Sequence, residues 1–215
     1  NVALDKPVYA APAQIDGAML LSTRDGFVLR IEAGSRISRL AVNEASDFAP
    51  AIYRSQVILD RQFLILAGTD GSLVASDPND RQAGWRTPVG AAFVSTPVIQ
   101  GDLVLAARRD GTLIACQIDR GEIFAQVSVG PEILAVWPHE GGLRGLTRTR
   151  QFTWMGRGEP TLVVLPREIV GGNQGVLVTK DRQVLIDRNN EWQLLGSISG
   201  RLSGVPVRWG DRAVI

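Results

Sequence analysis

Residues 70–76 have the sequence DGSLVAS, and residues 110–116 have the sequence DGTLIAC, 40 positions further along the chain. The dipeptides Val89-Gly90 and Val129-Gly130, which follow these segments, keep the same spacing. The register is therefore held over a whole unit. Because a period of roughly 20 to 50 residues is typical of solenoids and propellers, the sequence predicts a chain built from similar units.

Further copies of the motif extend this repeat over most of the chain. Residues 25–29 (DGFVL) carry it in the first unit, and residues 176–187 carry a degenerate copy in the fifth. In the fourth unit, the same offset places Arg150-Gln151 at the position of Asp110-Gly111. We expect repeats over residues 12–46, 50–90, 95–130, 133–167 and 168–200, with a partial unit formed by residues 204–215 together with 1–9.

Each unit consists of short apolar runs bounded by Gly, Pro and Asp, which is typical of β-strands. In the clearest unit, strands are predicted over residues 96–99, 103–108, 112–117 and 123–129. The Asp-Gly pairs between the second and third strands predict type I′ turns, in which both central residues have positive φ. No longer segment shows the 3.6-residue apolar period of a helix.

The sequence therefore predicts an all-β fold, and four antiparallel strands per unit of this length are typical of a β-propeller blade. A β-sandwich is the alternative, since it is also built from short, regularly spaced strands. A sandwich, however, does not require a sequence repeat of about 40 residues.

Composition limits the possible functions. The chain has 215 residues, 45% of them hydrophobic, and a net charge of +1, so it can fill a core, and nucleic-acid binding is not expected as its main task. A single cysteine, Cys116, and a single histidine, His139, exclude a disulfide framework within the chain and a multi-cysteine or histidine-rich metal site. No stretch approaches the roughly 18 apolar residues of a membrane span. A leader, anchor or membrane helix upstream of residue 1 is left open.

The repeat resembles the pyrroloquinoline-quinone-like (PQQ-like) repeat, in which an Asp-Gly-Thr-Leu-Ile-Ala-type strand is followed by a Gly-containing turn and a strand with Trp or Phe. Residues 95–130 match this pattern almost throughout, and Trp85 fills the tryptophan position one blade earlier. The resemblance implies a β-propeller similar to BamB-like and quinoprotein-like ones, with about five blades plus partial terminal blades. We expect residues 1–215 to form a single, incomplete domain, either a six-bladed ring with a defective closing blade or, as we favour, part of a seven- or eight-bladed ring.

The resemblance implies two possible functions. Quinoprotein dehydrogenases of this family hold PQQ against a tryptophan and a vicinal disulfide, beside Ca²⁺, but Cys116 has no cysteine neighbour and no complete cofactor site can be assigned. We therefore expect a non-catalytic scaffold or sensor module, without a cofactor, that binds a protein or peptide and not nucleic acid. The family favours an extracytoplasmic compartment, and the oligomeric state is left open. The alternative is the propeller portion of a PQQ-dependent oxidoreductase whose cofactor and Ca²⁺ ligands lie outside this chain.

A cluster of arginines beside aromatic residues is the candidate partner-binding patch. It comprises Arg144, Arg148, Arg150, Phe152 and Trp154, with Arg157 close behind. At the two-residue period of a strand, Arg148 and Arg150 share a face that Phe152 and Trp154 continue. Arginine beside aromatic rings is typical of binding hot spots and suits a protein or an acidic peptide. The alternative is an ordinary solvated surface on which arginine stems cover neighbouring side chains.

The remaining reactive residues are interpreted as structural. Cys116 lies at an apolar strand position, where a small buried cysteine is ordinary, and His139 lies in a hairpin turn. Asp77 and Asp80 offer oxygen ligands of the kind Ca²⁺ prefers, but the Pro and Asn between them are also simple turn residues. No catalytic, cofactor-binding or metal residue is therefore predicted.

Overall fold

The computed structural model describes residues 12–15, 17–23, 25–34, 36–41, 46, 51–54, 62–77, 84–173, 175–188, 191–199, 207–209 and 212–214. Their regular secondary structure is entirely β, as the sequence predicts. The predicted partial unit over residues 1–9 and 204–215 lies outside the described residues, except for two short strands near the C-terminus. No helix in the described part of the chain is long and apolar enough to cross a membrane.

The strands follow the predicted units closely. They are β1 Ala13–Ile15, β2 Ala18–Ser22, β3 Phe27–Ile31, β4 Ile37–Ala41, β5 Ala51–Arg54, β6 Gln62–Ala67, β7 Ser72–Ser76, β8 Gly84–Pro88, β9 Val98–Gln100, β10 Leu103–Ala107, β11 Thr112–Gln117, β12 Ile123–Ser128, β13 Ala135–His139, β14 Gly142–Leu146, β15 Arg150–Trp154, β16 Thr161–Val164, β17 Ile169–Asn173, β18 Val176–Thr179, β19 Gln183–Arg188, β20 Glu191–Ser197, β21 Val207–Trp209 and β22 Arg212–Val214. In the clearest unit, the predicted first strand begins two residues too early because Pro97 precedes the ladder, where a residue without an N–H is expected.

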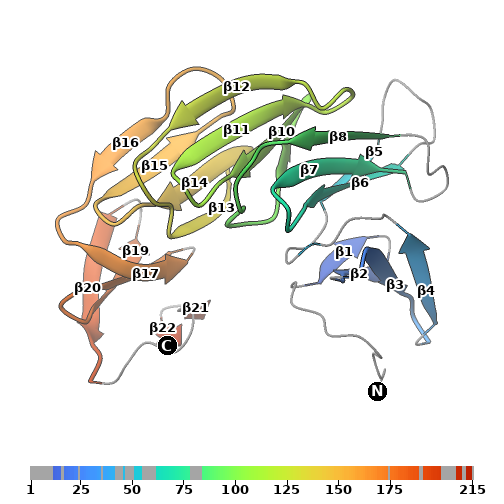
Figure 1. Cartoon of the computed structure of the whole chain (residues 1–215). Helices are drawn as coiled ribbons and strands as arrows, with labels where there is room; N and C mark the ends of the chain where they lie inside the picture. Colours follow the sequence, from blue (N-terminus) through green and yellow to red (C-terminus); the bar gives the residue numbers. More distant parts are fainter. Residues whose placement is uncertain are drawn as a thin grey trace.

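Each predicted repeat forms one four-stranded antiparallel sheet with its strands in sequence order, and β21 pairs with β22. Blades 1 to 5 are the sheets β1–β4, β5–β8, β9–β12, β13–β16 and β17–β20. First strands of neighbouring blades contact one another, β5 with β9 and β13 with β17, so the first strand of a blade is innermost and the fourth is outermost. Figure 1 shows the blades following one another along an arc, with blade 1 and β21–β22 on the two sides of its open end. The described residues thus form a propeller-like array that does not close into a ring.

The second strand of blade 3, β10, is a continuous apolar run because both of its faces are covered. In β10, Leu103, Leu105 and Ala107 belong to the cluster shared with blade 4. The alternate residues Val104 and Ala106 pack with side chains of blade 2. This strand, at the middle of its blade, therefore lacks the polar face of a half-buried strand.

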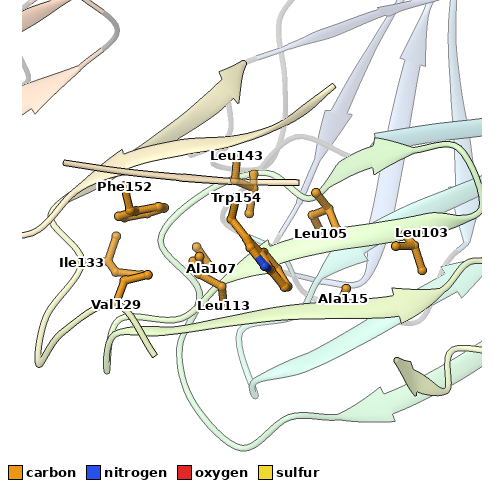
Figure 2. Packing of buried hydrophobic residues seen from close by; sticks show 10 residues of the cluster. All are labelled: Leu103, Leu105, Ala107, Leu113, Ala115, Val129, Ile133, Leu143, Phe152 and Trp154. Atoms are coloured by element: carbon orange, nitrogen blue, oxygen red, sulfur yellow. The ribbon is translucent and has the colours of Figure 1, made fainter. Parts of the chain in front are cut away.

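Among the described residues, the largest buried cluster lies between blades 3 and 4, where Phe152 and Trp154 of β15 pack with Leu105 and Leu113 of blade 3 (Figure 2). Both aromatic side chains are almost fully buried, at 0% and 1% relative exposure. Because burying one large apolar side chain contributes about 1.5–3 kcal/mol, this layer stabilises the packing of blade 4 on blade 3.

The Asp-Gly hairpins differ from the prediction. Of the pair Asp110-Gly111, the glycine alone has positive φ, 92°. The N–H of Arg108 donates to the carbonyl of Thr112 at 2.8 Å, and the N–H of Gly111 donates to the carbonyl of Arg108 at 3.2 Å. Residues 109–111 therefore form a three-residue loop, a type I turn closed by a left-handed glycine. The predicted type I′ turn is wrong here because one more residue belongs to the loop, and the aspartate caps the turn by accepting the N–H of Thr112 at 3.1 Å.

The hairpin of blade 4 is one residue shorter. The N–H of Thr147 donates to the carbonyl of Arg150 at 2.8 Å, which leaves Arg148 and Thr149 as the loop. The carbonyls of Arg109 and Arg148 each accept a hydrogen bond from an isoleucine N–H that leads into the next blade, at 3.3 and 2.7 Å. The alignment that places Arg150 at the position of Asp110 is therefore wrong, and Arg148 is the counterpart of Arg109.

Candidate functional site

The hairpins between second and third strands lie at the same end of the array as the connections between blades, which we call the hairpin end. In an antiparallel sheet with its strands in sequence order, the second and fourth strands run in the same direction and end on the same side. The hairpin after the second strand and the connection after the fourth strand therefore lie together. Backbone hydrogen bonds join the two sets of loops. The N–H of Arg109 donates to the carbonyl of Ala92 at 2.8 Å, and the N–H of Val129 donates to the carbonyl of Gly111 at 2.9 Å.

A pocket of about 750 Å³ opens at the hairpin end between blades 3 and 4. Four separate segments line it: residues 91–92 before blade 3, residues 109–110 of its hairpin, residues 131–132 before blade 4, and residues 147–149 of the blade 4 hairpin. Much of its wall is small and apolar, since it includes two alanines and a proline. A pocket of this size is within the range of ligand-binding pockets, and it is wide enough for side chains of a bound peptide.

The walls of the pocket are rigid because backbone contacts fix them. A methyl group placed on Gly111 would lie 1.4 Å from the carbonyl oxygen of Gly130, so hairpin and connection are in direct backbone contact. The hydroxyl of Thr147 both donates to the carbonyl of Arg150 and accepts its N–H, at 3.3 and 3.0 Å. These bonds preform the pocket without any ligand.

The charges around the pocket are only partly compensated. Arg148 donates from Nε to Oε2 of Glu132 at 3.0 Å, and its Nη2 lies 3.0 Å from the same oxygen in an ion pair. Asp110 is paired with Arg108. Arg109 is exposed at the pocket and forms no ion pair with any described residue. Its guanidinium is therefore available to an incoming acidic group.

The corresponding hollow between blades 4 and 5 is smaller, about 330 Å³, and its charged residues pair with one another. Arg167 pairs with Asp181, and Lys180 pairs with Glu168 at 2.9 Å. A hydrogen bond from the Thr179 hydroxyl lowers the pKa of Asp181, and the charge of Arg167 acts in the same direction. Both cations that line this second hollow are therefore already neutralised.

The structure does not bring the five residues of the predicted patch onto one surface. Arg150 is exposed at the start of β15, whereas Phe152 and Trp154 on the same strand face are core residues. The two-residue period is correct, but blade 3 covers that face beyond Arg150 (Figure 2). Of these five residues, Arg148 alone lines the pocket.

Arg144 is also buried, with 8% relative exposure, and its Nη1 lies 3.7 Å from Oδ2 of Asp187 in blade 5. The indole of Trp192 donates to Oε1 of Gln151 at 2.9 Å across the same boundary. Arg144 therefore joins blades 4 and 5. Arg157, at the opposite end, pairs with Asp102 at 3.0 Å.

The other reactive residues lie as follows. Cys116 is confirmed as a core residue, and burial raises the pKa of its thiol to about 11. His139 is the last residue of β13, and its Nε2 lies 3.8 Å from the carboxylate of Glu140. Glu140 and Gly141 form the turn that follows, with φ of 48° and 80°. Asp77 is buried, and Asp80 lies outside the described residues. Within the described ranges, no three His, Cys, Asp or Glu side chains are placed to hold a metal.

Sequence reasoning missed Arg109, although it stands next to the motif that defines the repeat. The sequence Arg108-Arg109-Asp110 offered a signal, because it places two arginines beside a single aspartate. Asp110 pairs with Arg108, which leaves Arg109 without an acidic partner in its own loop. The pocket itself could not be found by pattern, because its four segments are spread along the chain from Ala91 to Thr149.

Comparisons with known proteins agree with this architecture. The family model described as "Outer membrane protein assembly factor BamB" matches residues 24–194. The crystal structure of BamB from Moraxella catarrhalis has a TM-score of 0.64 and 14% identity, over 96% of this chain and 70% of that chain. Crystal structures of BBS1N in complex with ARL6DN, soaked with lead and with mercury, have TM-scores of 0.59 and 0.60, each at 16% identity. They cover 84% and 79% of this chain, which spans only 62% and 61% of theirs. No curated protein sequence matches the chain.

Proposed function

We propose that this chain, which belongs to the family of the outer membrane protein assembly factor BamB, is a non-catalytic scaffold or sensor module that binds a protein or peptide at its hairpin end. The observation that carries the proposal is the preformed pocket between blades 3 and 4. The names of the similar proteins support a protein partner, because BamB is described as an assembly factor and BBS1N was crystallised with ARL6DN.

The chemistry of the pocket favours an acidic peptide segment. Ala91, Ala92 and Pro131 provide an apolar wall for a small side chain, and Arg109 provides a cation beside it. A guanidinium can bind a carboxylate through two parallel hydrogen bonds, which adds orientation to charge attraction. Because backbone bonds hold the walls in place, binding costs little ordering of the scaffold.

Selection of random peptides displayed on phage, followed by affinity measurement with the purified chain, tests this function. Peptides that bind the wild type should lose affinity when Ala92→Trp fills the pocket. Arg109→Glu should weaken them at least about tenfold, since a charge-assisted hydrogen bond contributes about 1.5–3 kcal/mol. The matched controls Glu122→Trp and Arg120→Glu change exposed residues in the turn at the other end of blade 3 and should leave binding intact.

Equal binding by wild type and Ala92→Trp would exclude the pocket as the binding site. Binding that is lost in Ala92→Trp but unchanged in Arg109→Glu would support the pocket as the binding site and would show that the ligand does not need an acidic group. Thermal melting of each variant checks that the changes act on binding and not on folding.

A further inference from the structure

Two blades carry the same ion pair between the connection that leads into the blade and the hairpin of that blade. Glu132, in the connection before blade 4, pairs with Arg148 of the blade 4 hairpin at 3.0 Å. Glu168, in the connection before blade 5, pairs with Lys180 of the blade 5 hairpin at 2.9 Å. Each glutamate directly precedes an isoleucine whose N–H donates to the hairpin of the preceding blade. The two ion pairs therefore occupy the same place in the repeat.

Blade 3 has the basic residue of this pair but an alanine in place of the glutamate. Residues 89–93 (VGAAF) align with residues 129–133 (VGPEI) at the spacing of 40 that defines the repeat. The alignment places Ala92 at the position of Glu132. Arg109 is the counterpart of the basic residue in the blade 4 hairpin, so of the two partners blade 3 lacks the glutamate alone.

Backbone hydrogen bonds support this alignment. The N–H of Arg109 donates to the carbonyl of Ala92 at 2.8 Å, and the N–H of Lys180 donates to the carbonyl of Glu168 at 2.9 Å. The two positions that carry the ion pair in blade 5 are therefore joined in the same way in blade 3. A side-chain carboxylate at the position of Ala92 would consequently reach the guanidinium of Arg109.

No carboxylate of a described residue forms an ion pair with Arg109 in place of the missing one. Asp110, the acidic residue of the same hairpin, pairs with Arg108. Glu132, the other acidic residue that lines the pocket, is held by the arginine of the blade 4 hairpin. Ala92 and Arg109 are both exposed and both line the pocket, so the space that a glutamate side chain would fill is open to a ligand.

We infer that a partner supplies the missing carboxylate, and that an Asp or Glu side chain of the bound segment lies over Ala92 and pairs with Arg109. The chain's own glutamates make the same contact with their hairpin cations in blades 4 and 5. This inference rests on the proposed function and adds the chemical group that is recognised and its position in the pocket. Ala92 is then a specificity-determining residue, because its short side chain leaves the cation free for a carboxylate of the partner.

Restoring the glutamate should close the site. Ala92→Glu gives Arg109 an internal partner, which an acidic ligand must then displace. The probe is an acidic peptide selected for binding to the wild-type chain, with an amidated C-terminus so that only its side chains carry carboxylates. Ala92→Glu should weaken its binding at least about tenfold, the loss expected for one charge-assisted hydrogen bond. The matched control Ala92→Gln adds a side chain of similar size without charge and should weaken binding less than about threefold.

NMR titration of the introduced carboxyl group, in the protein without peptide, tests the ion pair itself. The pKa of this group should be lower in Ala92→Glu than in the same variant combined with Arg109→Gln, because a neighbouring guanidinium favours the charged form of a carboxyl group. Simple repulsion between the new charge and the peptide, without an ion pair to Arg109, would leave the two values equal. Thermal melting checks that each variant is folded.

These measurements separate the inference from the proposed function. If no peptide loses affinity in Ala92→Trp, the proposed function fails and the inference fails with it. If peptides bind at the pocket but Ala92→Glu and Ala92→Gln weaken them equally, the inference alone is overturned. It is also overturned if the introduced carboxyl group titrates alike with and without Arg109.

Discussion

Replacing Gly111 with alanine should destabilise the protein far more than the same replacement at Gly34. Both glycines have a left-handed backbone, with φ of 92° and 82°. An L-residue in that conformation costs roughly 1–2 kcal/mol, so both variants lose this amount. The difference between them comes from the surroundings of the added methyl group.

At Gly34 the methyl group would meet no atom within 4 Å, whereas at Gly111 it would lie 1.4 Å from the carbonyl oxygen of Gly130. The hairpin and the connection to blade 4 must then separate, at an overpacking cost of about 1–3 kcal/mol. Separation also weakens the hydrogen bond from Val129 to Gly111, which contributes about 1 kcal/mol. We expect a loss of about 3–6 kcal/mol for Gly111→Ala.

Chemical denaturation followed by tryptophan fluorescence measures both variants, since the chain has five tryptophans. Gly71→Ala gives an intermediate point, because its methyl group would lie 2.9 Å from the N atom of Ala91. The expected order of destabilisation is Gly111, then Gly71, then Gly34. Equal losses at all three positions would show that backbone conformation alone matters and that the hairpins do not press on the connections between blades.

Four other outcomes are expected. Arg182→Gly should raise stability by up to about 1 kcal/mol in thermal melts, because Arg182 has φ of 63° at a hairpin position that blade 3 fills with glycine. Arg144→Met should cost about 3 kcal/mol by leaving the carboxylate of Asp187 without this guanidinium, and Asp187→Leu in the same chain should recover most of it. Desolvation raises the pKa of Asp70, but the Ser72 N–H and Arg86 together lower it by more, so the net shift is downward. The contribution of Asp70 to stability should therefore be present above about pH 4 and fade as the pH falls through the lowered pKa. Asp70→Asn should reduce the pH dependence of the unfolding free energy measured over that range. Addition of PQQ and Ca²⁺ should give neither quinone absorbance nor dye-linked dehydrogenase activity, and either signal would favour the oxidoreductase alternative.

Local sequence was sufficient to predict the strands because their signals are short-range. The runs at residues 103–108 and 112–117 are apolar and bounded by Gly and Asp, and both became strands within a residue of the expected bounds. The regular spacing of the motif then predicted one sheet per unit. These features depend on backbone propensity and on alternation along a strand, which a single segment carries in itself.

Predictions that depended on the neighbouring blade were less successful. Phe152 and Trp154 share a strand face with Arg150, but blade 3 covers the aromatic residues and leaves the arginine in solvent. Arg144 was expected on the surface and instead meets Asp187 across a boundary between blades. The pattern of residues 144–154 does not indicate which faces of these strands the neighbouring blades will cover.

The sequence by itself determined that the chain is a series of four-stranded blades, because the period, the turns and the apolar runs are properties of consecutive residues. Tertiary structure alone decided which arginine is available and where the pocket lies. Arg108 and Arg109 are adjacent in sequence, yet the first pairs with Asp110 and the second lines a pocket completed by residues 91–92, 131–132 and 147–149. The physical reason is that a binding site depends on distances and charges between segments that only the packing of one blade on the next brings together.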